Sequence, residues 1–293
     1  MNNIIVFGGA GFIGSYLTEE LLSRGHNVIV ADIHSPKYPN VAKFVSCDIN
    51  SIEQINSVFS DDIDYVYNLA GFANLDEAVS NPLDTIRLNI MGNVNILEVI
   101  KEKKIKRYIY GSSAYAMNDK GSFYGISKLS SEKIIKEYKI KYGLAYSILR
   151  YGSIYSERNF DNNYIYNLVR EIILQKSIAN SGDGEEVREY IHASDVARMA
   201  ADVIDSEKYE GQYLILTGVE RMKRAELFEM IKEILGHNFE IQLKADENTN
   251  HYKYSPYALQ ANMSRKLVGN TYIDIGQGIL ECIKNVYKEI ESE

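Results

Sequence analysis

Two residues near the middle of the chain, Tyr124 and Lys128, have the types and the spacing of an acid–base pair. Four residues apart on a helix, they would share one face, although a chain with 23 tyrosines also produces such pairs by chance. A free tyrosine has a pKa of about 10, too high for a base at neutral pH, but a neighbouring ammonium lowers it by favouring the phenolate. A serine, Ser113, could hold a substrate hydroxyl in line. We expect these three side chains to move a proton while a nicotinamide accepts hydride.

A glycine-rich turn at the N-terminus supplies the context for that chemistry. Glycines stand at positions 8, 11 and 14, after an apolar run that predicts a strand and before a pattern that predicts a helix. Without Cβ atoms the backbone can turn sharply and approach a pyrophosphate, and the helix N-terminus offers free N–H groups to the anion. The alternative is a strand–helix turn with no ligand. In this context nucleotide binding is favoured.

Asp32, eighteen residues after Gly14, ends the second predicted strand. A carboxylate there can accept hydrogen bonds from an adenosine ribose diol. It would repel the 2′-phosphate of NADP, and residues 33–37 contain no arginine to offset this. The cofactor predicted is therefore NAD, although an aspartate at a strand end is also commonly just solvated.

The elements that must position these residues follow an alternating pattern. Strands alternating with helices predict an α/β fold, a Rossmann-type doubly wound parallel sheet with helices on both faces. Strands are expected over 4–7, 27–31, 43–46, 64–69, 107–110 and 145–150, and helices over 13–23, 52–59, 83–101 and 124–141.

After Tyr151 the alternation loosens. We expect an NAD-binding domain over 1–160 and a smaller C-terminal substrate-binding lobe over 161–293, which shares elements with the first. Its helices are expected over 164–175, 194–204, 224–235 and 275–290, and its strands near 187–191, 212–216 and 239–243.

Composition excludes several classes of protein. The net charge of −8 argues against a nucleic-acid partner. The two cysteines, Cys47 and Cys282, lie far apart, which fits a reducing cytoplasm better than a secreted disulfide framework. The five histidines form no metal-ligand pattern, and no apolar run approaches bilayer length. We expect no metal, no membrane segment and a cytoplasmic protein.

Further motifs give these features a family pattern. They are Asn68-Leu69-Ala70-Gly71, Asn89, Ser112-Ser113, the stretch 149–155, Gly182-Asp183-Gly184, the stretch 188–192 and Asp195-Val196-Ala197. With the glycine turn and Tyr124-x-x-x-Lys128, they resemble the extended short-chain dehydrogenases/reductases, and more narrowly their NAD-dependent sugar-nucleotide epimerase/dehydratase branch. The resemblance covers about residues 1–235.

The resemblance implies a role for each matching position. Ser113, Tyr124 and Lys128 would be catalytic, and Tyr124 and Lys128 would also contact NAD. The other cofactor residues would be Gly8, Gly11, Phe12, Ile13, Gly14, Asp32, Ile33, Asp48, Ile49, Leu69, Ala70 and Gly71. The substrate residues would be Ser112, Ser113, Asn89, Ser153 and Arg188, with Arg188 on the diphosphate. Alternatively, Arg188 pairs with Glu185, Glu186 or Glu189 on the surface.

The resemblance also implies a reaction, oxidation of the C4 hydroxyl of a nucleotide-diphosphate sugar (GDP-, UDP- or dTDP-linked) to a 4-keto sugar. Ser113 is followed by Ala114-Tyr115-Ala116 rather than by an acid, which disfavours a 4,6-dehydratase. A 4-epimerase and a 4-dehydrogenase, such as one acting on GDP-heptose for capsular polysaccharide, remain, with the dehydrogenase slightly favoured. Alternatives are a 4-reductase, an enzyme of a non-nucleotide substrate and a non-catalytic NAD-binding protein.

The resemblance further implies a homodimer. The helices expected near 84–101 and 124–141 are similar to the pair through which this family dimerises as a four-helix bundle.

Overall fold

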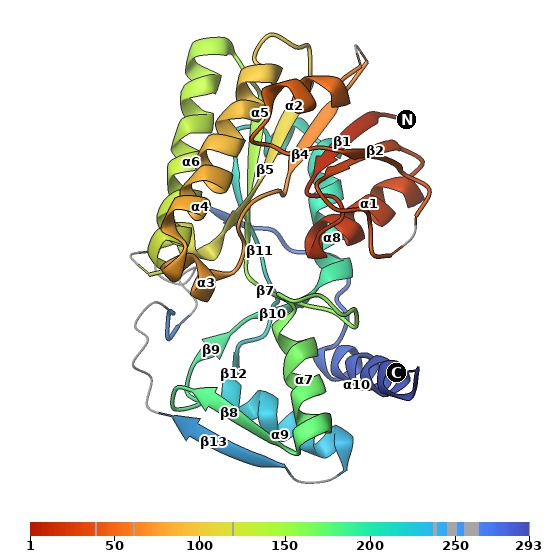
Figure 1. The fold of residues 1–293 in the computed structure, drawn as a ribbon, viewed down its shortest axis with the longest axis vertical. Coiled ribbons are helices and arrows are strands. Elements are labelled where there is room, and N and C mark those ends of the chain that lie inside the picture. The colour runs from red at the N-terminus through yellow and green to blue at the C-terminus, as the bar shows by residue number, and fades with distance from the viewer. Residues whose placement is uncertain are drawn as a thin grey trace.

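The computed structural model describes residues 1–38, 40–60, 62–118, 120–236, 239–244, 251–254 and 264–292. Within these residues the largest sheet has eight strands, and all neighbouring strands in it are parallel (Figure 1). Their order is β14-β11-β6-β5-β4-β1-β2-β3, so the direction of winding reverses between β1 and β4. The strands are β1 (Asn3–Phe7), β2 (Asn27–Asp32), β3 (Lys43–Ser46), β4 (Tyr65–Asn68), β5 (Arg107–Ser113), β6 (Tyr146–Tyr151), β11 (Tyr213–Leu216) and β14 (Arg265–Lys266).

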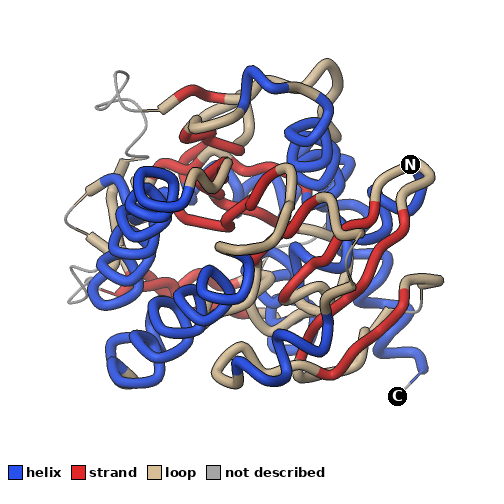
Figure 2. Tube along the Cα trace, turned by 90° about the horizontal axis from the view of Figure 1, so that it is seen from above, coloured by secondary structure: helices blue, strands red, loops and turns tan. Residues whose placement is uncertain are grey.

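Helices cover both faces of this sheet (Figure 2). On one face α1 (Phe12–Ser23) and α8 (Ala193–Asp202) pack together, with Leu17 and Val196 in a shared core. On the other face α2 (Ile52–Val58), α5 (Asn93–Ile100) and α6 (Ser122–Tyr142) cover a second core. Because the sheet is covered twice, its inner strands are continuous buried runs rather than alternating ones, as in β4 and β6. The predicted α/β fold of the Rossmann type is confirmed.

The helix expected over 83–101 is interrupted. The segment forms α3 (Leu75–Ser80), α4 (Pro82–Ile86), one π-helical turn over Arg87–Gly92 and then α5. Inside the π-helical turn the Ser131 hydroxyl donates to the backbone oxygen of Asn89 at 2.7 Å. In a π-helical turn the backbone hydrogen bonds are rearranged, so this carbonyl oxygen can accept a hydrogen bond from the neighbouring helix α6. Such turns are common near functional sites.

A smaller second lobe lies below the sheet, past the ends of its strands (Figure 1). Its helices α7 (Tyr164–Gln175), α9 (Arg224–Leu235) and α10 (Ile275–Ser292) share one core. Its strand pairs are β8–β13, β9–β12 and β7–β10. These strands are β7 (Ser153–Tyr155), β8 (Ser177–Ser181), β9 (Val187–Arg188), β10 (Tyr190–His192), β12 (Met222–Lys223) and β13 (Glu240–Lys244). The elements α8, β11 and β14 follow residue 160 in the chain but belong to the large sheet and its helical layer. Residues after 160 therefore contribute to both the sheet domain and the second lobe. The division at residue 160 stays a prediction.

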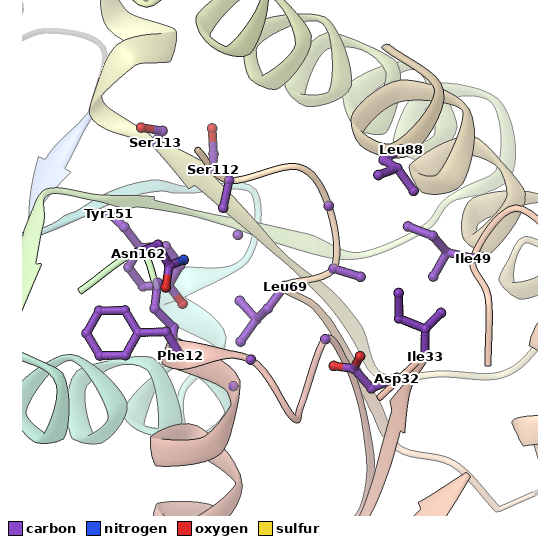
Figure 3. A pocket seen from close by; sticks show the side chains of 18 of the residues that line it. Phe12, Asp32, Ile33, Ile49, Leu69, Leu88, Ser112, Ser113, Tyr151 and Asn162 are labelled. Atoms are coloured by element: carbon purple, nitrogen blue, oxygen red, sulfur yellow. The ribbon is translucent and has the colours of Figure 1, made fainter. Parts of the chain in front are cut away.

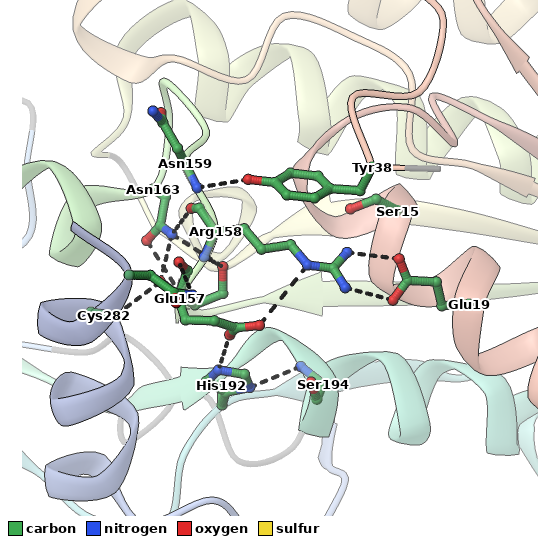
Figure 4. A network of polar contacts seen from close by, with 12 residues as sticks. Ser15, Glu19, Tyr38, Glu157, Arg158, Asn159, Asn163, His192, Ser194 and Cys282 are labelled. Atoms are coloured by element: carbon green, nitrogen blue, oxygen red, sulfur yellow. Dashed lines mark hydrogen bonds and ion pairs between the residues drawn. The ribbon is translucent and has the colours of Figure 1, made fainter. Parts of the chain in front are cut away.

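A polar network joins the two parts where the chain crosses from β7 to α7 (Figure 4). Arg158 forms two hydrogen bonds to the Glu19 carboxylate of α1, at 2.8 and 2.7 Å. Glu157 accepts from His192 Nε2 at 2.9 Å, and His192 Nδ1 in turn accepts from the Ser194 N–H. Burial alone would raise the pKa of Glu157, but the bond with His192 lowers it to about 2. The Asn285 side chain of α10 donates to the backbone oxygen of Glu157 at 3.1 Å, so this crossing segment is fixed to helices of both parts.

Among the described residues, no helix is long and apolar enough to cross a bilayer. The same part of the chain contains no group of three or more histidine, cysteine or acidic side chains that could hold a metal ion.

Candidate functional site

A cavity of about 540 Å³ opens at the carboxyl ends of the central strands (Figure 3). In doubly wound sheets ligands bind at this edge, where the winding direction reverses. The loops after β1, β2, β3 and β4 and the end of β5 all line it. Among its lining residues are Gly8, Gly11, Phe12, Ile13, Gly14, Asp32, Ile33, Asp48, Ile49, Leu69, Ala70, Gly71, Ser112, Ser113, Tyr124 and Lys128. The structure therefore brings together every position predicted for the cofactor and the catalytic step.

The glycine turn has no room for larger side chains. Gly8 has φ +75°, and a Cβ there would stand 2.5 Å from the backbone nitrogen of Ala70. A Cβ on Gly14 would stand 2.1 Å from the backbone oxygen of Gly8. The turn leads directly into the N-terminus of α1, whose free N–H groups suit an anion.

Asp32 lies at the opposite end of the cavity from Ser113 (Figure 3). Its carboxylate accepts from the backbone N–H of Ala10 at 3.1 Å and from that of His34 at 3.2 Å. These bonds hold the carboxylate at the end of β2, beside the exposed side chain of Ile33. A fixed acceptor in this position fits a ribose diol.

The predicted catalytic residues meet at the other end of the cavity. Lys128 Nζ lies 5.9 Å from the ring centroid of Tyr124 and donates to the backbone oxygen of Gly111 at 2.9 Å. Ser113, the last residue of β5, lies close enough to the Tyr124 phenol to influence its pKa. β5 continues three residues beyond its predicted end at 110, which places Ser112 and Ser113 on the strand itself.

The cavity thus joins a phosphate-compatible glycine turn, a fixed ribose acceptor and a serine–tyrosine–lysine set. The model of the NAD dependent epimerase/dehydratase family matches residues 4–215. The chain belongs to this family. NAD is its cofactor, and the glycine cradle fits that dinucleotide because a Cβ at Gly8 or Gly14 would fill it.

Individual relatives extend the likeness over the whole chain. A protein of Methanocaldococcus jannaschii, provisionally named a UDP-glucose 4-epimerase, is 29% identical over 96% of this chain and 97% of its own length. The solved UDP-glucose 4-epimerase of Thermotoga maritima with UDP-glucose has a TM-score of 0.82 at 26% identity, covering 98% of this chain and 99% of that one. The solved UDP-glucose 4-epimerase of Thermus thermophilus with NAD has a TM-score of 0.81 at 25% identity, covering 97% and 99%.

The electrostatics of the NAD-site residues differ from the sequence prediction. The sequence predicts that the neighbouring ammonium lowers the pKa of Tyr124, whereas burial is the largest influence on that pKa in the structure. Burial raises the pKa of the Tyr124 phenol, and the side chain of Ser113 opposes that rise. Burial also lowers the pKa of Lys128 to about 8, against the nearby charge of Glu132. Both groups are desolvated, which disfavours the charged form of each.

A buried ion pair supports the catalytic strand, and the sequence reasoning missed it. Arg150 donates to both carboxylate oxygens of Glu132 at 2.9 and 2.6 Å, and both side chains are buried. The Ser112 hydroxyl donates to the same carboxylate at 2.6 Å. Ser112 is thus tied to the protein interior, and its predicted contact with substrate stays a prediction. The available signal was Glu132 itself, four residues after Lys128 on the same helical face.

Asn89 lies behind the cofactor loop. Its side-chain oxygen accepts from the Phe72 N–H at 2.7 Å, and its amide donates to the Phe72 oxygen and to Ser127. A Cβ on Gly71 would lie 2.3 Å from that side-chain oxygen. Asn89 therefore clamps the loop after β4, and its role in substrate binding stays a prediction.

The other two predicted substrate residues lie in the second lobe. Ser153 is in β7, half-buried, and pairs with Tyr190 of β10. Arg188, in β9, is buried, and its guanidinium lies 4.3 Å from the ring centroid of Tyr252. The alternative of a surface ion pair does not describe Arg188, because its side chain is buried and its guanidinium packs on the face of the Tyr252 ring. Its role at a diphosphate stays a prediction.

Proposed function

We propose that this protein uses NAD to oxidise the C4 hydroxyl of a UDP-sugar to a 4-keto sugar. The observation that carries the proposal is the single cavity with Ser113, Tyr124 and Lys128 at one end and the glycine turn with Asp32 at the other. That spacing supports a dinucleotide whose adenosine lies at Asp32 and whose nicotinamide lies at Tyr124.

Each side chain then has one task. Ser113 orients the substrate hydroxyl, and Tyr124 takes its proton. Lys128 holds the nicotinamide ribose and favours the ionised phenol. NAD supplies the hydride acceptor. Proton removal by a positioned base of this kind contributes about 10²- to 10⁴-fold to the rate.

Two outcomes follow from the same oxidation. Return of the hydride to the opposite face of the sugar gives a 4-epimerase, whereas release of the ketone gives a 4-dehydrogenase. The relatives named as UDP-glucose 4-epimerases support the epimerase and a UDP-linked substrate. We therefore propose a UDP-sugar 4-epimerase first and the 4-dehydrogenase as the alternative.

Incubation with UDP-glucose, UDP-galactose and UDP-glucuronic acid separates these outcomes. An epimerase equilibrates the C4 epimers without net formation of NADH, which NMR and absorbance at 340 nm together record. A dehydrogenase accumulates a 4-keto sugar and one NADH per turnover. Bound NAD with no turnover of any UDP-sugar, or of the GDP- and dTDP-linked forms, would favour the non-catalytic alternative.

For the substrate, we propose that Arg188 binds the diphosphate and that Ser153 lies beside the sugar. Arg–phosphate hydrogen bonds are charge-assisted and directional. Burial of Arg188 supports this, since a desolvated guanidinium binds an anion more strongly than an exposed one. We keep the division into an NAD-binding part over 1–160 and a substrate lobe over 161–293 as part of the proposal.

We also propose a homodimer formed through α4 and α6. These helices pack against each other and expose apolar side chains, with Leu83 77% and Ile126 63% exposed. Exposed apolar side chains on two helices that pack together support a protein interface there. Sedimentation should show a dimer that Ile126→Glu dissociates, whereas Val41→Glu, 90% exposed in a loop, should leave it intact. A monomeric wild-type protein would contradict the proposal.

Finally, we propose a cytoplasmic location. Both thiols, Cys47 and Cys282, are free and buried, which supports a reducing compartment.

A further inference from the structure

A tyrosine beside the catalytic residues carries a hydrogen-bonded chain that the oxidation does not use. Tyr115 stands two residues after Ser113, and its backbone N–H donates to the Ser113 hydroxyl oxygen at 3.3 Å. Its phenol oxygen lies 2.8 Å from Nδ1 of His251. His251 Nε2 lies 3.1 Å from a carboxylate oxygen of Asp76 in α3. His251 lies 136 positions after Tyr115 in the chain and 175 positions after Asp76.

The direction of proton donation in this chain follows from the carboxylate. An ionised carboxylate only accepts hydrogen bonds, so His251 carries its proton on Nε2 and donates it to Asp76. Nδ1 is then the acceptor, and the Tyr115 phenol donates to it. The histidine is thereby set to take a proton from the tyrosine.

The ring of Tyr115 contacts two further aromatic rings, those of Tyr124 and Tyr252. Its ring meets the ring of Tyr124 edge to face, with centroids 6.2 Å apart, and lies 4.7 Å from the ring centroid of Tyr252. The Tyr252 ring in turn makes a cation–π contact with the Arg188 guanidinium. Under the proposed function, a sugar with its C4 at Tyr124 and its phosphates at Arg188 would lie beside Tyr115.

We propose that Tyr115, His251 and Asp76 form a second acid–base group that exchanges the proton on a carbon next to the C4 carbonyl of the 4-keto sugar. This inference rests on the proposed function, because only a C4 ketone makes the neighbouring C–H bonds acidic.

The exchange balances without any oxidant. His251 Nδ1 takes the Tyr115 proton, and the resulting phenolate takes the proton from the C–H bond next to the carbonyl. The C–H electron pair forms a C=C bond while the carbonyl pair moves onto oxygen, which gives an enolate. Ser113 donates a hydrogen bond to that oxygen. While the enolate persists, the partly exposed His251 loses its proton to water, and the Tyr115 phenol then exchanges its own proton through His251. The reverse steps therefore return a solvent proton to the carbon.

The histidine is needed because the phenol would not ionise unaided. Burial of the Tyr115 side chain raises the pKa of its phenol, and the nearby Arg188 charge opposes this only in part. A base held on the phenol oxygen removes that obstacle, as in other activated nucleophiles and bases.

The test uses the NAD-loaded full-length protein and UDP-4-keto-6-deoxyglucose in D₂O, with deuterium uptake at the carbons beside C4 followed by NMR. Wild type is expected to exchange well above the rate in buffer. Tyr115→Phe and His251→Asn should lower that rate by about 10²-fold or more. His251→Asn keeps a side-chain acceptor but cannot take the proton. Tyr254→Phe, which removes a phenol that is 64% exposed on the same segment, is the matched control.

Oxidation of UDP-glucose by the same variants separates this inference from the proposed function. Tyr124→Phe should lose C4 oxidation yet keep exchange of the supplied ketone within about tenfold, and Tyr115→Phe should show the reverse. Exchange by wild type no faster than in buffer, exchange at wild-type rate in Tyr115→Phe, or joint loss of both activities in Tyr115→Phe would overturn the inference. Tyr115-dependent exchange without any oxidation of UDP-sugars would support it and count against the proposed function.

Discussion

The cofactor end and the substrate end of this site are built in different ways. The cofactor end consists of glycines, backbone N–H groups and the ends of buried parallel strands, all within the first half of the chain. The proposed substrate end consists of side chains from distant segments, such as Arg188 on Tyr252 and Tyr115 on His251. Backbone geometry recognises one constant ligand, whereas exchangeable side chains can adapt to different sugars.

The largest difference should come from the buried support of the catalytic strand. Glu132→Ala leaves Arg150 buried without its carboxylate, which costs about 3–5 kcal/mol of unfolding free energy. Glu281→Ala removes an exposed pair with Lys284 in α10 and should cost less than about 1 kcal/mol. Urea unfolding of both variants measures the contrast. Equal stability of the two would show that the pair does not support the strand.

The next effect depends on pH. Lys128 has a folded pKa of about 8, below its ordinary 10.5, so the unfolded chain binds more protons between these values and stability rises with pH across this window. Lys128→Met removes the cost of burying the ammonium and should be more stable than wild type below pH 8, by on the order of 3 kcal/mol. The difference in unfolding free energy between Lys128→Met and wild type should shrink as the pH rises from 8 to 10.5. Thermal melts of NAD-free protein test this, and a gap that is constant with pH would contradict it.

A smaller effect is expected when alanine replaces one of two helical glycines, because only one of the two lies in the NAD cradle. Alanine normally stabilises a helix by about 1 kcal/mol relative to glycine. Gly14→Ala instead forces a Cβ to 2.1 Å from the Gly8 oxygen. Overpacking of this kind costs about 1–3 kcal/mol and should weaken NAD binding roughly ten- to a hundredfold. Gly276→Ala in α10, where the nearest atom is an Asp274 oxygen at 3.1 Å, should leave NAD binding unchanged by calorimetry. A loss in both variants would mean that the cradle is not what fits NAD.

The smallest effect concerns the substrate end alone. Arg188→Ala should weaken UDP binding about tenfold, because one charge-assisted contact is lost, and should leave NAD affinity unchanged. Arg221→Ala, an exposed arginine paired with Glu189, is the control. Calorimetric titration with UDP and with NAD compares them. UDP affinity equal to wild type in Arg188→Ala would remove Arg188 from the diphosphate site.

The same contrast explains how much could be predicted from the sequence. The strands, the long helices and the cofactor positions were predictable because periodicity and the spacing of Gly8, Gly14 and Asp32 are local signals. The interruption of the helix near Asn89 could not be predicted, because it depends on contacts of Asn89 with Phe72 and Ser131. The raised pKa of Tyr124 was missed because spacing carries no information on burial.

The substrate end was the least predictable part for the same reason. The contacts of Tyr115 with His251, and of His251 with Asp76, join residues more than a hundred positions apart. No pattern within a window of sequence reports such pairs.

The account depends most on the Tyr124 phenol as the base that takes the C4 proton while NAD accepts hydride. Its most direct test is the turnover of UDP-glucose by NAD-loaded Tyr124→Phe, measured by NMR beside the amount of NAD that copurifies. We predict a fall in rate of about 10²- to 10⁴-fold with NAD still bound. A variant that keeps near-normal turnover would contradict the mechanism.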